Sequence, residues 1–198
     1  MSAIPWWASE GLWRKVAVWV TAIMFVVLIL LSFHSVSVIQ VGTERVPAYS
    51  VINQRIDYRF DADRNRQVPV IGDDAPLFGN KLSDSESEAL VTQGKKVIQG
   101  RNCMNCHTLL GNGAYFAPDL TKAWLDPAWG AETTREALML SFLLDPETNA
   151  RTYGTGRKMP DLGLTEAEAK AVIAYLKWMS AIDTNGFPYN FKPIMQGE

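Results

Sequence analysis

The pattern of hydrophobic positions near the N-terminus predicts one membrane-spanning helix. Residues 16–33 read VAVWVTAIMFVVLILLSF and contain no charged side chain. A helix rises ~1.5 Å per residue, so this run of 18 residues is ~27 Å long and almost matches the ~30 Å hydrocarbon core of a bilayer. We therefore expect residues 1–35 to comprise a short N-terminal stub and a transmembrane anchor helix.

The charges around this run predict its orientation. Arg14 and Lys15 stand directly before it, and the first cation after it is Arg45. Because loops rich in Lys and Arg remain in the cytoplasm, we expect a cytoplasmic N-terminus and an external remainder. A cleaved signal peptide is the alternative, but its apolar core would be shorter and an A-x-A cleavage site would follow. His34, at the outer end of the helix, is expected to be an interfacial residue rather than a metal ligand.

Residues 36–82 form a connecting segment with a weaker pattern. Ile56, Tyr58 and Phe60 alternate with charged residues, which is the period of a half-buried strand. Val68 and Val70 follow the polar stretch DADRNRQ, so the segment favours a β-hairpin. Prolines on both flanks leave an irregular linker open as the alternative.

Residues 83–198 carry the signals of three amphipathic helices separated by loops. The third helix has an apolar stripe at spacings of three and four, and the sequence NARTYGTGRKMPDLGL before it predicts a loop. Each helix is preceded by a Ser or Thr followed three residues later by Glu, which is a capping box. The three pairs are Ser85 with Glu88, Thr133 with Glu136, and Thr165 with Glu168. The predicted fold class is therefore mainly α, with a small β element in the connecting segment.

Composition and charge exclude several classes of function. The formal net charge is -2, and no basic stripe is present to neutralise phosphates, so nucleic-acid binding is not expected. The chain has two cysteines and two histidines. Two cysteines cannot build a disulfide framework, and His34 and His107 are too far apart in the sequence to complete a zinc site with them.

The strongest chemical signal is the sequence Cys-Met-Asn-Cys-His. Cys103, Cys106 and His107 form C-x-x-C-H, the spacing at which two thiols attach one haem c while the next residue ligates its iron. The motif follows directly on a predicted helix, on the outer side of the predicted membrane anchor. The alternatives are a disulfide or a thioredoxin-like redox pair, but the latter needs a βαβ unit that the sequence does not show. We therefore predict one covalent haem c.

The second axial position of the iron requires another side chain, and a methionine is expected because His34 lies beside the membrane. Met159 stands in the loop KMPDL, where Pro160 fixes the following backbone. The other methionines fall between the thiols, at apolar positions of helices, in the membrane run or near the chain ends: Met104, Met139, Met179, Met24, Met1 and Met195. We predict Met159 as the second ligand. An iron with two protein ligands is closed and transfers electrons.

The sequence FAPDL after the haem motif resembles c-type cytochromes at one further position. Pro118 stands eleven residues after His107. In c-type cytochromes a proline carbonyl at about this distance accepts a hydrogen bond from the haem histidine and fixes its ring. We expect the same of Pro118, and a proline that merely ends a loop is the alternative.

Three stretches give a more specific resemblance: CMNCHTLLGNGAYFAPDLTK, GRKMPDLGLTEAE and YLKWMSAIDTNGFPYN. Together they resemble the cytochrome c subunit of bacterial cytochrome c-dependent nitric oxide reductase. The resemblance implies a class I-like cytochrome c domain on the periplasmic side of the inner membrane. It also implies electron donors that are soluble c-type cytochromes or cupredoxins. The implied recipient is a large membrane catalytic subunit, whose haem and non-haem iron reduce nitric oxide to nitrous oxide.

The resemblance carries two finer expectations. Gly113 and Tyr115 match a loop that reaches the large subunit and helps to hold a calcium ion at the interface, for which backbone carbonyl oxygen is suitable chemistry. Residues 36–82 are longer than the connection expected in this family, and we hypothesise that they pack against the large subunit or at the donor site. Two other functions stay open at this point. They are a cytochrome c that serves another terminal oxidase, and a haem gas sensor with a displaceable Met159.

Overall fold

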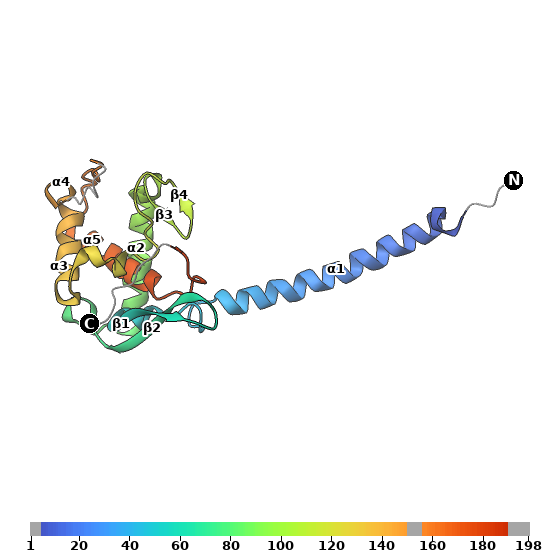
Figure 1. The fold of residues 1–198 in the computed structure, drawn as a ribbon, viewed down its shortest axis with the longest axis horizontal. Coiled ribbons are helices and arrows are strands. Elements are labelled where there is room, and N and C mark those ends of the chain that lie inside the picture. The colour runs from blue at the N-terminus through green and yellow to red at the C-terminus, as the bar shows by residue number, and fades with distance from the viewer. Residues whose placement is uncertain (1–4, 150–155, 190–198) are drawn as a thin grey trace.

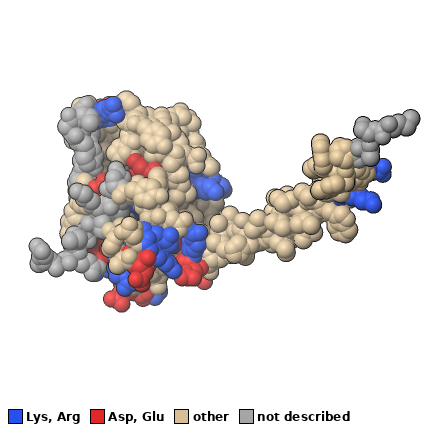
Figure 2. Space-filling view, turned by 45° about the vertical axis from the view of Figure 1, so that its right-hand side comes forward, with Lys and Arg blue, Asp and Glu red and all other residues tan. Residues whose placement is uncertain are grey.

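A computed structural model describes residues 5–149 and 156–189, in which one long helix leads into a compact domain (Figure 1). Helix α1, Glu10–Ile39, has 30 residues and begins after Ser9, whose Oγ accepts a hydrogen bond from the backbone N–H of Leu12. It contains the predicted run 16–33, and it is long and apolar enough to cross a membrane. Its surface between the two ends carries no charge, as Figure 2 shows.

The domain is mainly helical, as predicted, with two small hairpins. The remaining helices are α2 (Asp84–Gly100), α3 (Glu132–Leu144), α4 (Pro146–Asn149) and α5 (Glu166–Ser180). The strands are β1 (Gln54–Asp61), β2 (Arg66–Asp74), β3 (Thr108–Leu109) and β4 (Asn112–Gly113), paired antiparallel as β1 with β2 and β3 with β4. Part of the loop predicted between α3 and α5, residues 150–155, lies outside the described residues.

Helices α2 and α5 cross at very short distance, and Gly94 is the reason. A methyl group at Gly94 would overlap the carbonyl oxygen of Ala171 and lie 2.8 Å from Cβ of Tyr175. The missing side chain of Gly94 therefore allows the two backbones to touch. Around this crossing the interior is apolar, with Val91, Ile173 and other buried residues of both helices in one core cluster.

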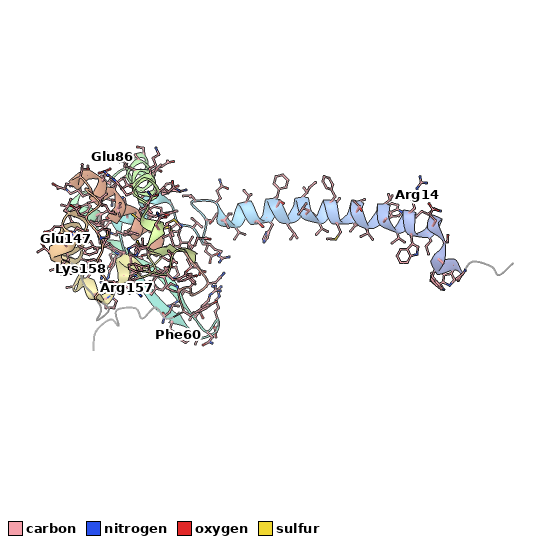
Figure 3. The ribbon with its side chains drawn as sticks, turned by 90° about the horizontal axis from the view of Figure 1, so that it is seen from above. Arg14, Phe60, Glu86, Glu147, Arg157 and Lys158 are labelled. Atoms are coloured by element: carbon pink, nitrogen blue, oxygen red, sulfur yellow. The ribbon has the colours of Figure 1, made fainter. Side chains whose placement is uncertain are left out.

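The connecting segment forms the predicted β-hairpin, and the alternative of an irregular linker is wrong. Ile56 and Tyr58 point inward and are buried in the same core as α2 and α5. The hydroxyl of Tyr58 donates to the carbonyl of Ile182 at 3.3 Å. Phe60 continues the same face beyond the core and is 54% exposed, near the tip of the hairpin, where Figure 3 labels it. The hairpin thus closes one end of the domain.

Two buried lysines attach this end of the domain to α5. The Nζ of Lys122 donates to the carbonyl of Ile182 at 2.8 Å, and burial lowers the pKa of Lys122 to about 7. The Nζ of Lys177 donates to the carbonyl of Ala75 at 2.8 Å, and burial lowers its pKa to about 8. Since each ammonium group bonds to backbone carbonyls, both lysines stabilise the path of the chain around the C-terminal end of α5.

The helix starts agree with the sequence only in part. Thr165 and Glu168 make the predicted capping box of α5. The box of α2 is made by Ser83 and Glu86, not by Ser85 and Glu88, so the helix begins two residues earlier than predicted. The box predicted from Thr133 and Glu136 is wrong: α3 follows Ala131 without a side-chain cap. The carboxylate of Glu136 accepts instead from the backbone N–H of Phe78 at 2.8 Å, a tertiary contact that competes with the cap.

We predict that Gly94→Ala weakens the domain, because the added methyl group would force α2 and α5 apart. Overpacking of this kind costs about 1–3 kcal/mol in free energy of unfolding. Thermal unfolding of the full chain, followed by circular dichroism, measures the change. Gly100→Ala in the same helix is the control, since nothing lies within 4 Å of its added carbon. An equal effect of the two substitutions would contradict the role given to Gly94.

Candidate functional site

The largest chemical signal of the sequence lies at a cavity of about 390 Å³ in the domain. Its walls come from the C-terminal end of α2, the segment that follows it and the segment before α5. Cys103, Cys106, His107 and Met159 all line this cavity. The fold therefore brings residues separated by more than fifty positions to one site, and the walls are predominantly apolar.

A tight turn presents the Cys-x-x-Cys-His motif to the cavity. Helix α2 ends at Gly100, and Asn102 adopts the left-handed backbone conformation, with φ of 56°. A single 3-10 turn, Cys103–Asn105, follows, and the backbone N–H of His107 donates to the carbonyl of Cys103 at 3.0 Å. Both cysteines are free thiols and half-buried, and burial raises the pKa of the Cys103 thiol. The turn thus aims two thiols and one imidazole at the same space.

The imidazole of His107 is oriented by the carbonyl of Pro118, as expected. The distance from Nδ1 to this oxygen is 2.7 Å. A carbonyl can only accept, so Nδ1 carries the proton and Nε2 keeps its lone pair. Burial lowers the pKa of His107, against the opposing effects of the Pro118 carbonyl and of Asp119. A neutral ring with its lone pair on Nε2 is the form that ligates a metal.

The loop that carries Pro118 is held to the motif by hydrogen bonds that the sequence did not indicate. The hydroxyl of Thr108 donates to the Asp119 carboxylate at 2.6 Å, and the backbone N–H of Ala117 donates to the carbonyl of Cys106 at 2.8 Å. Gly113 has φ of +116°, and a side chain there would overlap the carbonyl of His107. These contacts fix the position of Pro118 relative to His107.

Two arginines anchor the segment that contains Met159. The guanidinium of Arg157 lies 4.7 Å from the centre of the Phe116 ring and donates to the Phe116 carbonyl at 2.8 Å. On the other side, Arg101 donates to the carbonyl of Leu162 at 3.2 Å and pairs with Glu168 at 3.0 Å. Sequence reasoning missed both arginines, because their partners are distant in the chain. Figure 3 labels Arg157 next to Lys158.

The other candidate residues lie elsewhere. Met139 and Met179 are each 2% exposed in the core, as expected of residues that fill space, and Met24 lies in α1. Gly113 lies in β4, and Tyr115 is 82% exposed at the rim of the cavity, where its hydroxyl donates to the Gly111 carbonyl at 3.3 Å. Neither residue has a described contact that indicates a bound cation. Met1 and Met195 lie outside the described residues.

The residues present fit a covalently attached haem. The site combines two free thiols at the required spacing, an imidazole whose ring orientation is fixed, a methionine thioether and apolar walls. Fold and site together define a c-type cytochrome domain on a long apolar helix. In agreement, the cytochrome c family profile matches residues 91–180.

Similar proteins narrow this class. The cytochrome c subunit of nitric oxide reductase from Stutzerimonas stutzeri is 36% identical over 115 residues, which are 57% of this chain and 74% of that protein. The protein of the same name from Halomonas halodenitrificans is 34% identical over 113 residues, 55% of this chain and 72% of that protein. The one from Paracoccus denitrificans is 31% identical over 109 residues, 55% and 71%. The chain therefore belongs to the family of the cytochrome c subunit of nitric oxide reductase, as the sequence resemblance predicted.

We predict that Arg157→Gln loosens the segment around Met159. The variant loses a cation–π contact and a charge-assisted hydrogen bond, together worth on the order of 1–2 kcal/mol, so local opening should become about tenfold more frequent. Hydrogen exchange of residues 156–162 in the haem-loaded chain, followed by mass spectrometry, measures this. Lys158→Gln removes the neighbouring cation and should leave exchange unchanged. Native-like exchange in the Arg157 variant would contradict the anchoring role.

Proposed function

We propose that the chain is the membrane-anchored electron-transfer subunit of a nitric oxide reductase. It accepts electrons from a soluble periplasmic donor, a small c-type cytochrome or a cupredoxin, and passes them to a large membrane catalytic subunit that reduces nitric oxide to nitrous oxide. One observation carries the proposal: His107 and Met159 line the same cavity as the two thiols, in a chain whose relatives are named as subunits of nitric oxide reductase.

Each site residue has a distinct role in this proposal. Cys103 and Cys106 attach the haem through thioether bonds, while His107 and Met159 occupy the two axial positions of its iron. Pro118 keeps the His107 ring in one orientation and raises its basicity through the Nδ1 hydrogen bond. Bound haem c supplies a one-electron redox centre.

The two axial residues decide what this chain does. Because His107 and Met159 together fill both axial positions, the chain leaves no coordination site for nitric oxide, and the reduction is assigned to the catalytic subunit. A thioether ligand favours a comparatively high potential. The apolar walls, which include Phe116, Trp129 and Phe142, exclude water and favour the same direction. The chain is thus a relay without catalytic residues of its own.

The arrangement in the membrane completes the proposal. Residues 1–35 form a cytoplasmic stub and the single-pass anchor, residues 36–82 connect it, and residues 83–198 are the periplasmic haem domain. Arg14 and Lys15 support this orientation, because they precede the span while the domain follows it. The loop with Gly113 and Tyr115 lies at the surface and is proposed to face the catalytic subunit, where its oxygens contribute to a calcium site.

We predict that Met159→Ala leaves the haem attached but opens the iron. The reduction potential should fall, and the reduced protein should bind carbon monoxide stoichiometrically, whereas the native chain should bind almost none. Potentiometric titration and optical spectra measure both. Met139→Leu, a buried methionine outside the cavity, is the control and should behave as the native chain.

Three results would separate the alternatives. Rapid carbon monoxide binding by the native chain would indicate a gas sensor and contradict the relay. Retention of covalent haem after replacement of both Cys103 and Cys106 by Ser would contradict the attachment. An unchanged potential in the Met159 variant would exclude Met159 as the ligand.

The assignment to nitric oxide reductase has its own test. The tagged full chain, purified in mild detergent from its native host, should bring down one large integral membrane protein in equal amount, and the complex should consume nitric oxide with a reduced c-type cytochrome as donor. The Met159→Ala complex should lose at least tenfold of this donor-driven rate. Recovery of a different terminal oxidase, with no nitric oxide consumption, would replace the proposal by service to that oxidase.

A further inference from the structure

A second cavity, of about 550 Å³, lies apart from the haem site, on the side of the domain from which α1 leaves. The last residue of α1, the segment 41–49, helices α2 and α5 and the segment 182–187 together form its walls. In Figure 1 the segment after α5 runs beside the outer end of α1. None of the predicted haem-binding residues contributes to this cavity.

The cavity stands at the height of the lipid headgroups if α1 crosses a membrane. The uncharged run of the sequence ends at Phe33, and Ile39 lies six residues, or ~9 Å, further along the helix. The headgroup layer adds ~5–8 Å on each side of the hydrocarbon core. Ile39 lines the cavity, so the cavity opens at the outer boundary of this layer.

Apolar residues continue from the span into the cavity. Ile39 is 65% exposed, Val41 38% and Leu110 48%, and all three lie on the cavity wall. Tyr49 and Trp178 also line it, with their ring centres 5.1 Å apart. Exposed aliphatic groups beside aromatic rings are typical of surfaces in contact with the membrane interface. The exposed apolar surface is thus continuous with the part of α1 that contacts acyl chains.

The charged residues of the cavity favour an anion. Among the described residues, three charged side chains line it: Arg45, Lys95 and Asp183. The carboxylate of Asp183 is compensated by Arg66, at 3.3 Å. Arg45 spends one of its five N–H donors on a long contact of 3.4 Å to the backbone oxygen of Asp183, and Lys95 is exposed on α2. The balance is two cations on an apolar cavity next to a membrane.

We propose that this cavity binds one anionic phospholipid from the leaflet at the outer end of α1. The phosphate contacts Lys95 and Arg45, and the acyl chains descend along the upper turns of α1. A lipid is favoured over a polypeptide because the apolar wall runs without interruption into the membrane span and the cations lie at headgroup height. The bound lipid would fix the height and tilt of the haem domain above the membrane. This inference needs α1 to span a membrane but is independent of the electron-transfer partner.

Native mass spectrometry of the full haem-loaded chain, released from nanodiscs that contain phosphatidylglycerol and phosphatidylcholine, tests the proposal. We expect one retained phosphatidylglycerol, preferred at least tenfold over phosphatidylcholine. Lys95→Gln should reduce its retention about fivefold, as expected for the loss of one cation near an anionic headgroup. Lys96→Gln removes the adjacent exposed cation, which does not line the cavity, and should leave retention unchanged. Arg45→Lys, which keeps the charge, should retain most of the binding.

Several results would overturn the proposal. They are equal retention of the two lipids, equal effects of the Lys95 and Lys96 variants, or displacement of the lipid by soluble glycerol 3-phosphate at equal concentration, which would indicate a phosphate site without a lipid. A photoreactive residue in place of Leu110 provides a second test in the purified complex. Crosslinking to lipid supports the proposal, whereas crosslinking to a segment of the large membrane protein assigns the cavity to protein. The covalent haem spectrum should be native in every variant, so failure here is distinguishable from failure of the electron-transfer proposal.

Discussion

The close crossing of α2 and α5 at Gly94 is the constraint on which the haem site depends. Helix α2 ends three residues before Cys103, and α5 begins seven residues after Met159. Because the two helices touch at Gly94, the end of one and the start of the other lie on the same side of the domain. The ion pair between Arg101 and Glu168 joins these two ends directly. One backbone contact therefore brings together both segments that form the cavity.

The rest of the site is a matter of orientation. The Pro118 carbonyl fixes the His107 ring, and the Thr108 to Asp119 hydrogen bond holds the loop that carries this carbonyl. Arg157 connects the Met159 segment to the same loop through Phe116. A redox site that only transfers electrons benefits from such rigidity, because little has to reorganise when the charge of the metal changes. The polar contacts around the cavity are consistent with that requirement.

The connecting segment is an integral part of the domain rather than a spacer. Ile56 and Tyr58 enter the core shared by α2 and α5, and the buried Lys122 bonds to the carbonyl that also receives the Tyr58 hydroxyl. The tip of the hairpin is tied to the segment after α5 by the ion pair of Arg66 and Asp183. The hairpin, this segment and the end of α1 thus meet on the side of the domain that faces the membrane, opposite in role to the haem cavity.

The sequence alone determined everything that depends on neighbours in the chain. The anchor helix follows from an uninterrupted apolar run, the turn at Cys103 to His107 from a motif of five residues, and the start of α5 from a capping box. The hairpin was visible as an alternation of apolar and charged residues. Tertiary structure decided what depends on distant partners. Glu136 bonds to Phe78 instead of capping α3, and the arginines at positions 101 and 157 hold the Met159 segment. A local pattern cannot reveal these contacts, because their free energy arises only when packing brings the two partners together.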